Sequence, residues 1–228
     1  MFSPEGDLIR QQTAPAQGFG ALWRGGIDPG GRVWDDLFEL READAPERLG
    51  RTSADWSQVD TLELPLCLRP GWHRRDALYS KPIEGTPLAR YAYPVPFYPA
   101  PVQAFDWRSG AVWCAPSGAE YRLVKLDIES HDTLATIAGG GEPVQVGPAE
   151  RDSAIGELRK FLRRMGEPDV DWARIPAVKP LVAGAAVDAE GRLWVQRSSA
   201  DSTSQFDLYS ETGQPIATVP TSCEDTSR

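Results

Sequence analysis

The sequence predicts an all-β chain built from repeated units of four short antiparallel strands. The pattern D-x-x-G-R-[VL]-W occurs at residues 28–34 and 188–194, and a third copy at 106–113 has one extra residue. An apolar stretch precedes each aspartate, so each copy predicts a strand, a tight turn and a returning strand. Asp favours such turns because its side chain bonds to the nearby backbone, and Gly supplies a positive φ.

A second pair of strands is predicted after two of these copies. Residues 121–127 alternate between apolar and polar side chains, a turn follows, and 132–137 return as another strand. Residues 205–209 and 214–219 repeat this arrangement, and 59–64 match its outer member. Each full unit therefore has four short antiparallel strands, which is the composition of one β-propeller blade.

The two ends of the sequence predict an incomplete propeller. Residues 2–9 align with 209–216, so we expect the chain to begin inside the last hairpin of a blade, and it stops soon after Val219. A propeller protects its strand edges by closing its ring, and a piece of one would expose edges at both ends. A small complete β-sandwich is the alternative.

The copies are spaced more widely than single blades of about 40–50 residues, so other segments lie between them. Residues 66–92, rich in Pro, Gly and Arg, predict a long loop. It leads to a strand at 88–97, which belongs either to a degenerate blade or to a neighbouring one. Residues 148–165 predict an amphipathic helix, because apolar side chains recur at helical spacing. We expect this helix to pack as a lid over a propeller face; binding of its basic, amphipathic surface to a membrane or partner is the alternative.

These elements predict one partial propeller domain over residues 1–228. Its expected parts are the end of a blade (1–17), a blade (18–65), the long loop and strand (66–100), a second blade (101–140), the inserted helix (147–166), a third blade (178–220) and a tail (221–228).

Composition limits the function classes. With 41% hydrophobic and 25% charged residues among 228, the chain is globular and long enough to bury a core. The formal net charge of −9 argues against a nucleic-acid surface or an anionic membrane as partner. No apolar run approaches the roughly 18–20 residues of a membrane helix. The N-terminus, MFSPEGDLIR, shows no signal-peptide pattern.

Several segments together resemble a known family. They are WRGGIDPGGRVWD (23–35), YPVPFYPAPVQAFDWRSGAVW (93–113), YRLVKLD (121–127), PAERDSA before the helix, RIPAVKP (174–180) and VDAEGRLWV (187–195). This order resembles bacterial six-bladed β-propeller proteins of the NHL- or TolB-like type, over residues 23–219. The resemblance implies a propeller fold of the six-bladed type, an exported setting and no established reaction. The copy at 106–113 departs from the motif, with Ala111 in place of Arg and an extra residue at Ser109.

The residues that carry catalysis or hold metals are sparse. Cys67, Cys114 and Cys223 share no short spacing, so we expect buried or incidental thiols rather than a zinc site or a disulfide framework. The only histidines are His73 and His131, and asparagine is absent. The sequence therefore predicts no catalytic residue, no metal site and no cofactor. The recurrent Asp28, Asp106 and Asp188 are expected to be structural, because repetition in every blade is what turn chemistry requires.

Five residues are candidates for ligand binding. Arg24 lies on a predicted channel strand at 22–27 and Lys179 precedes another at 183–187, so each could meet an anion. Trp72, Trp107 and Tyr98 lie in loops or turns, where they could form an aromatic contact surface. Structural packing is the competing interpretation for each. The predicted function is a non-enzymatic propeller domain that binds a protein, peptide or small ligand on one face. The alternative is a channel-centred, metal-dependent hydrolase or lyase of lactonase-like type.

Overall fold

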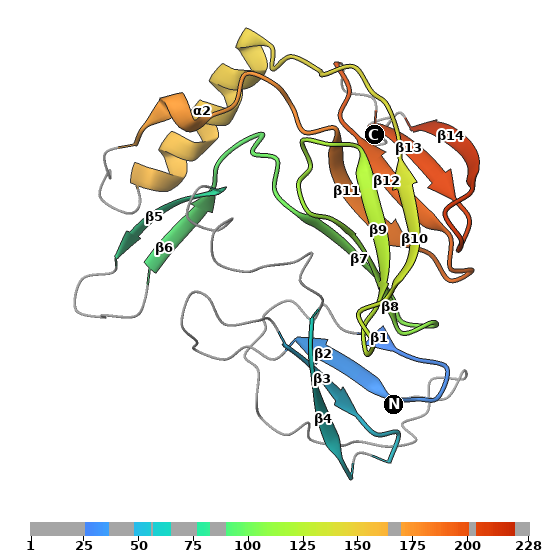
Figure 1. Ribbon diagram of the computed structural model, residues 1–228. Coiled ribbons are helices and arrows are strands. Elements are labelled where there is room, and N and C mark those ends of the chain that lie inside the picture. The colour runs from blue at the N-terminus through green and yellow to red at the C-terminus, as the bar shows by residue number, and fades with distance from the viewer. Residues whose placement is uncertain are drawn as a thin grey trace, which may run out of the picture.

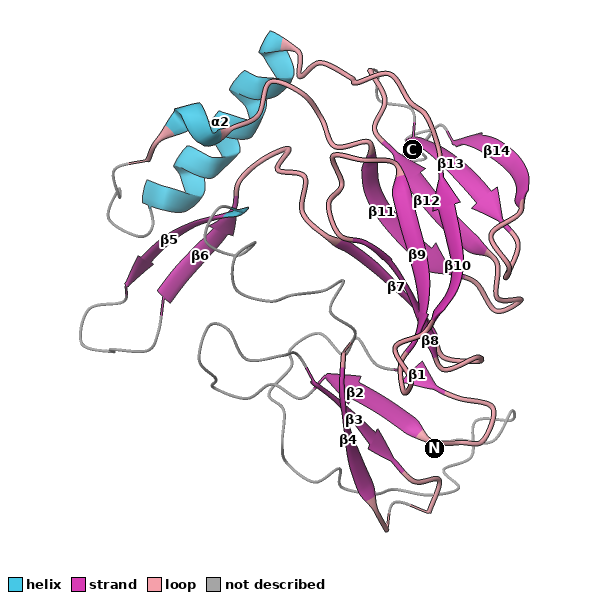
Figure 2. Ribbon diagram, viewed as in Figure 1, coloured by secondary structure: helices cyan, strands magenta, loops and turns pink. Residues whose placement is uncertain are grey.

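The computed structural model describes residues 26–36, 48–55, 57–64, 77–82, 90–163, 170–200 and 204–221. Over these residues the chain forms three four-stranded antiparallel sheets, a two-stranded hairpin and one α-helix, which confirms the all-β prediction (Figures 1 and 2). The first sheet contains β1 (Gly26–Ile27), β2 (Val33–Asp36), β3 (Arg48–Thr52) and β4 (Val59–Glu63). The second contains β7 (Val102–Asp106), β8 (Ala111–Ala115), β9 (Arg122–Asp127) and β10 (Thr133–Ala138). The third contains β11 (Val182–Val187), β12 (Leu193–Arg197), β13 (Ser204–Tyr209) and β14 (Pro215–Thr221).

Each sheet is a meander, in which every strand pairs with the next strand of the chain. The predicted pair at 121–127 and 132–137 is β9–β10, and the pair at 205–209 and 214–219 is β13–β14. The first strands of the second and third sheets, β7 and β11, lie beside each other (Figure 1). The predicted N-terminal blade end, 1–17, lies outside the described residues.

The tryptophans of the three motif copies occupy equivalent positions. Each pairs, in the first hairpin of its sheet, with the residue two positions before the motif aspartate: Gly26 with Trp34, Ala104 with Trp113, and Ala186 with Trp194. Trp34 is buried between the first and second sheets, and Trp113 is buried between the second and third. Successive sheets therefore stack in the same sense, whereas Trp194 faces away from this stack and is only half-buried.

Two apolar cores hold the stack together. The first core joins residues of the first sheet to the second: Trp34, Leu49 and Leu64 pack with Val112, Cys114, Leu126 and Ile128. The second core joins the second sheet to the third: Ala104, Trp113, Ala115, Tyr121, Leu123 and Ile137 pack with Val182, Leu193 and Val195. Alternate residues of the middle sheet thus serve different cores, because successive side chains of a strand point to opposite faces.

The motif aspartates of the first and third sheets bind their own arginine and tryptophan. Asp188 accepts hydrogen bonds from the Arg192 backbone N–H at 2.9 Å, Arg192 Nε at 2.7 Å and the Trp194 indole N–H at 2.9 Å. Asp28 accepts the same three bonds in its own sheet, at 3.0, 2.6 and 3.1 Å. The prediction that these aspartates are structural is confirmed, since each fixes its turn and anchors the tryptophan.

The second sheet uses a lysine from another strand for this purpose. Asp106 accepts hydrogen bonds from Lys125 Nζ at 2.9 Å and from Ser109 Oγ at 2.6 Å. Lys125 pairs with Trp113 across β8 and β9, and it binds the aspartate in this sheet, where Ala111 occupies the position of the motif arginine. Two buried side-chain atoms of the described residues have no hydrogen-bond partner, Asp106 Oδ1 and Trp113 Nε1. In the second sheet, Ser109, the extra residue of the turn, and Lys125 therefore bind the aspartate, whereas the motif tryptophan does so in the other two sheets.

The substitution Trp194→Phe is expected to raise the pKa of Asp188. Burial acts to raise this pKa, but the hydrogen bonds from Trp194 and Arg192 outweigh burial and lower it to about 2. Because an unfolded aspartate has a pKa of about 3.9, these bonds stabilise the fold above about pH 4 and lose their effect as the pH falls toward about 2. The variant should therefore lose less stability on acidification than the wild type.

Carboxyl NMR titration and urea unfolding at several acidic pH values measure both effects. Trp34→Phe acts on Asp28 in another sheet and should leave the titration of Asp188 unchanged. An Asp188 pKa that stays at about 2 in Trp194→Phe would contradict the assignment.

The predicted helix is α2 (Pro148–Arg163), but it does not cover a four-stranded sheet. Its buried Leu158 and Leu162 pack with Tyr79, Val95 and Ile175, which come from the hairpin and from the segment around the short helix η2 (Trp172–Arg174). The hairpin consists of β5 (Leu78–Pro82) and β6 (Arg90–Pro94). The predicted strand at 88–97 is thus β6, whereas β5 lies in the predicted loop. The helix α2 lies beside this hairpin (Figure 1), and its apolar side chains pack against it.

The prediction of unpaired thiols is wrong for Cys114. Cys114 lies on β8 with no exposed surface and is disulfide-bonded. The other two cysteines, at 67 and 223, lie outside the described residues. A disulfide depends on which segments meet in space, and the spacing of cysteines along this sequence does not show that.

Candidate functional site

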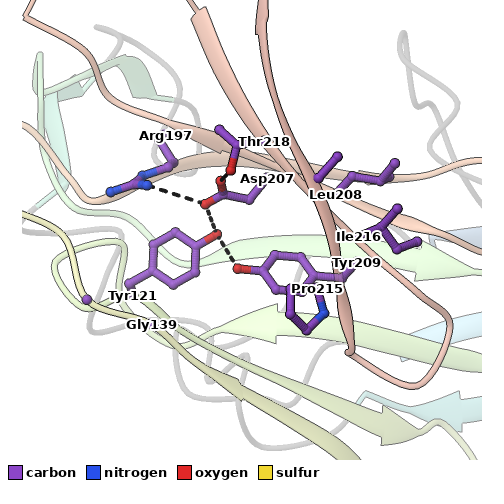
Figure 3. A pocket seen from close by; sticks show the side chains of 11 residues that line it. Tyr121, Gly139, Arg197, Asp207, Leu208, Tyr209, Pro215, Ile216 and Thr218 are labelled. Atoms are coloured by element: carbon purple, nitrogen blue, oxygen red, sulfur yellow. Dashed lines mark hydrogen bonds and ion pairs between the residues drawn. The ribbon is translucent and has the colours of Figure 1, made fainter.

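A cleft lies where the second and third sheets meet at the outer strands of the third sheet. It has a volume of about 340 Å³, which is within the range of small-molecule sites. Backbone and side chains of β12, β13 and β14 form one wall, and Tyr121 with the glycines after β10 form the other (Figure 3). Pro215 and Ile216 provide apolar surface beside the polar groups.

Asp207 is at the centre of a polar network in this cleft. Its Oδ2 accepts a hydrogen bond from the Tyr121 hydroxyl at 2.5 Å, and its Oδ1 accepts one from Thr218 Oγ1 at 2.8 Å. Arg197 lies 3.7 Å from the same Oδ2 atom (Figure 3). Asp207 is 8% exposed, and these three partners compensate the cost of burying its carboxylate.

The hydrogen bonds of the two tyrosines run in one direction. The Tyr121 and Tyr209 hydroxyls are 2.9 Å apart. Because Tyr121 donates its only proton to the Asp207 carboxylate, its oxygen must accept the proton of Tyr209. Tyr209 Oη is therefore left with acceptor capacity and no proton to donate to a ligand.

Both phenols remain protonated at neutral pH. Burial raises the pKa of Tyr121 far above its ordinary value, and the hydrogen bond that Tyr121 donates to Asp207 raises it further. Burial also raises the pKa of Tyr209, an effect that the nearby Asp207 charge reinforces. Neither phenol can act as a base at neutral pH, so the network is suited to binding and positioning.

Arg197 is the positively charged group of the cleft. Its guanidinium lies 5.6 Å above the centre of the Tyr121 ring, and 30% of its side chain is exposed. Its contact with Asp207 is longer than a hydrogen bond, so its N–H groups keep capacity for an acceptor. An arginine held by an aromatic face and a carboxylate is preorganised for a planar anion.

A glycine after β10 allows Tyr121 to occupy this position. A Cβ atom at Gly139 would lie 2.5 Å from the Tyr121 ring, so another residue would displace the tyrosine. The Gly139 N–H also donates to the Tyr121 carbonyl at 2.9 Å. The glycine run at 139–141, predicted to be a flexible exit from the strand, thus begins with a residue that fixes one wall of the cleft.

The repeat itself does not require this polar network. Trp113 pairs with Lys125 and Trp194 pairs with Leu208, so the positions that correspond to Asp207 and Tyr209 in the second sheet are 124 and 126. Val124 and Leu126 occupy them and pack in the first core. The interface between the first and second sheets is therefore formed with apolar residues at the positions that Asp207 and Tyr209 occupy in the third sheet.

Of the five predicted ligand-binding residues, the structure describes Lys179, Trp107 and Tyr98, and none of these three lines this cleft. Arg24 and Trp72 lie outside the described residues. Lys179 forms an ion pair with Glu150 of α2 at 2.8 Å and donates to the Ser199 carbonyl at 2.8 Å. Its side chain is 9% exposed, and it ties α2 to the third sheet.

The two predicted aromatic residues lie in separate places. Trp107 stacks on Phe105, with 4.5 Å between ring centres, and lies 5.8 Å from Trp34. It lines a second cavity of about 300 Å³ at the turns of the first and second sheets. Tyr98 packs at the edge of the α2 cluster. The structure does not bring the three described candidates, Lys179, Trp107 and Tyr98, together.

The sequence patterns do not single out the residues of the cleft. They predict strands at Tyr121, Asp207 and Tyr209 and give Arg197 no role. A comparison of β9 with β13, aligned through Lys125 and Leu208, which pair with the motif tryptophans, gives a signal for the site. In this alignment the polar Asp207 and Tyr209 correspond to the apolar Val124 and Leu126.

The described part of the chain contains no group of three or more His, Cys, Asp or Glu side chains placed to hold a metal ion. Of the helices that the structure describes, none combines the length and hydrophobicity needed to cross a bilayer. The chain matches no model of a known protein family, and no curated protein matches it either.

Proposed function

We propose that the three sheets are consecutive blades of a β-propeller and that the chain acts as a binding module. The blade assignment is supported by the equivalent stacking of Trp34 and Trp113 and by the contact between β7 and β11, the first strands of neighbouring sheets. Propeller blades meet in this way, with their first strands nearest the common axis. A relationship to six-bladed NHL- or TolB-like proteins of bacteria is part of this proposal.

The proposed binding site is the cleft around Asp207, and the proposed ligand is a small hydroxylated carboxylate such as a sugar acid. The presence of Arg197 and Tyr209 in the lining of one cleft is the observation that carries this choice. Arg197 offers N–H donors for a carboxylate, and Tyr209 Oη offers an acceptor for a hydroxyl. Pro215 and Ile216 can pack on the apolar face of a sugar ring.

Binding without catalysis is supported by the protonation of the network. Tyr121 stays a phenol, and both oxygens of Asp207 already accept hydrogen bonds, from Tyr121 and Thr218, with the Arg197 guanidinium 3.7 Å away. The site then holds a ligand through groups whose positions are fixed before it arrives, which reduces the entropic cost of binding.

An oxidising compartment is the proposed setting. The disulfide at the fully buried Cys114 supports it, because structural disulfides persist mainly in secreted and periplasmic proteins.

Galacturonate is expected to stabilise the chain against thermal unfolding, whereas galactose, which lacks the carboxylate, should have little effect. A tenfold excess over the dissociation constant adds about 1.4 kcal/mol to the free energy of unfolding. Arg197→Met should abolish the response to galacturonate, and Tyr209→Phe should weaken it. Arg122→Met, at an exposed position of β9, is the matched control and should respond like the wild type.

Differential scanning fluorimetry and titration calorimetry measure the response. Absence of galacturonate binding by the wild type, or equal binding by Arg197→Met, would contradict the proposed ligand class.

A further inference from the structure

Each interface inside the three-sheet stack joins one face of a sheet to the opposite face of the next sheet. The two outer sides of the stack are formed by the same two kinds of face. We define the leading face as the side of the first sheet that carries Ile27 and Val33. The trailing face is the side of the third sheet that carries Ala186, Trp194 and Phe206. Inside the stack, the trailing side of one sheet meets the leading side of the next at both cores.

The leading face exposes apolar residues more than the same positions of the other sheets do. Ile27 pairs with Val33, as Phe105 pairs with Val112 and Val187 with Leu193. Val33 is half-buried, whereas the corresponding Val112 and Leu193 have no exposed surface. Ile27 is 55% exposed, whereas Phe105 and Val187 are half-buried. The first sheet thus presents aliphatic side chains at the positions where the second and third sheets contact the sheet before them.

The trailing face is the less covered counterpart of two buried surfaces. Ala104 is 5% exposed in the second core, and the corresponding Ala186 is exposed. The Asp188 side chain is 20% exposed, whereas that of Asp28 in the same hydrogen-bonded arrangement is 3% exposed. Because the local hydrogen bonds of the two aspartates are the same, their difference in exposure reflects how far the face of each sheet is covered by neighbouring residues.

We propose that the leading face of one copy of this chain packs on the trailing face of another copy. A second copy is the expected partner, because the chain itself twice packs an aliphatic leading side against a tryptophan-bearing trailing side. Such a head-to-tail contact is heterologous, and it produces a closed ring or a filament. Two copies that close a ring would place six four-stranded sheets around one axis. This inference does not involve the cleft around Asp207.

Sedimentation velocity and light scattering test the contact with variants of exposed residues. The wild type is expected to form species of two or more copies in the micromolar range. Ile27→Glu on the leading face and Ala186→Glu on the trailing face should each give monomers, because a charge would be buried without a partner. Leu134→Glu, at an edge strand with 52% exposure, is the matched control and should assemble like the wild type.

A mixture of the two blocked variants gives the decisive result. Ile27→Glu keeps a functional trailing face and Ala186→Glu keeps a functional leading face, so an equimolar mixture should form a dimer with one copy of each. A wild type that stays monomeric would overturn the proposal and leave both faces to a different partner. Mixtures that stay monomeric, or assembly that persists in both single variants, would also overturn it.

Discussion

The substitution Asp106→Asn is expected to lower the free energy of unfolding by about 3–5 kcal/mol, because it leaves the Lys125 charge buried without its counter-ion. The two side chains are 2% and 4% exposed, and the ion pair measures 2.9 Å. Burial acts to raise the pKa of Asp106, but the hydrogen bonds from Ser109 and Lys125 lower it overall, so the carboxylate is ionised in the folded state. Urea unfolding at neutral pH measures the loss.

The matched control for this prediction is Asp188→Asn. Its partner Arg192 is 41% exposed and stays hydrated after the substitution, so we expect a smaller cost of about 1–2 kcal/mol. Adding Lys125→Met to Asp106→Asn removes the unpaired charge and should recover part of the lost stability. Equal costs at positions 106 and 188, with no recovery in the double variant, would contradict this account of the buried pair.

The substitution Trp34→Ala is expected to cost about 3–5 kcal/mol, and Trp194→Ala clearly less, although both remove the same hydrogen bond to an aspartate. Trp34 is 1% exposed and packs with the second sheet, where Trp107 lies 5.8 Å away. Trp194 is half-buried and makes an edge contact with Phe206 of its own sheet, with 6.3 Å between the ring centres. The difference between the two variants isolates the contribution of the covering sheet.

Chemical denaturation of both variants, at a protein concentration where the chain is monomeric, provides this comparison. If head-to-tail contact occurs, the cost of Trp194→Ala should increase with protein concentration, whereas that of Trp34→Ala should increase less. Equal costs in dilute solution would show that the second sheet does not stabilise the protein through Trp34.

Local patterns predicted the strands and the roles of two aspartates, because these depend on neighbouring residues. The turn at Asp188 needs only Gly191 at positive φ and an arginine and tryptophan at fixed spacing, all within seven residues of sequence. The helix at 148–163 follows in the same way from its own apolar periodicity. In contrast, β5 lies in a segment rich in Pro, Gly and Arg, and it is a strand because it pairs with β6.

The candidate site could not be predicted in the same way, because its residues meet only after folding. Tyr121 and Asp207 come from different sheets and form a hydrogen bond across 86 positions of sequence. Lys125 likewise replaces an arginine of the turn from a separate strand. The disulfide at Cys114 belongs to the same class of feature, since it also depends on segments that are distant in the sequence.

Each of the three sheets is formed by one uninterrupted stretch of chain, and this has a consequence for evolution. A duplication or deletion of such a stretch would change the number of sheets without requiring any strand to change partner. The helix and its hairpin lie in the connections between sheets, where an insertion leaves the strand pairing of both neighbours intact. Homologous recombination at these connections could therefore lengthen or shorten the protein while each unit kept its own aspartate and tryptophan.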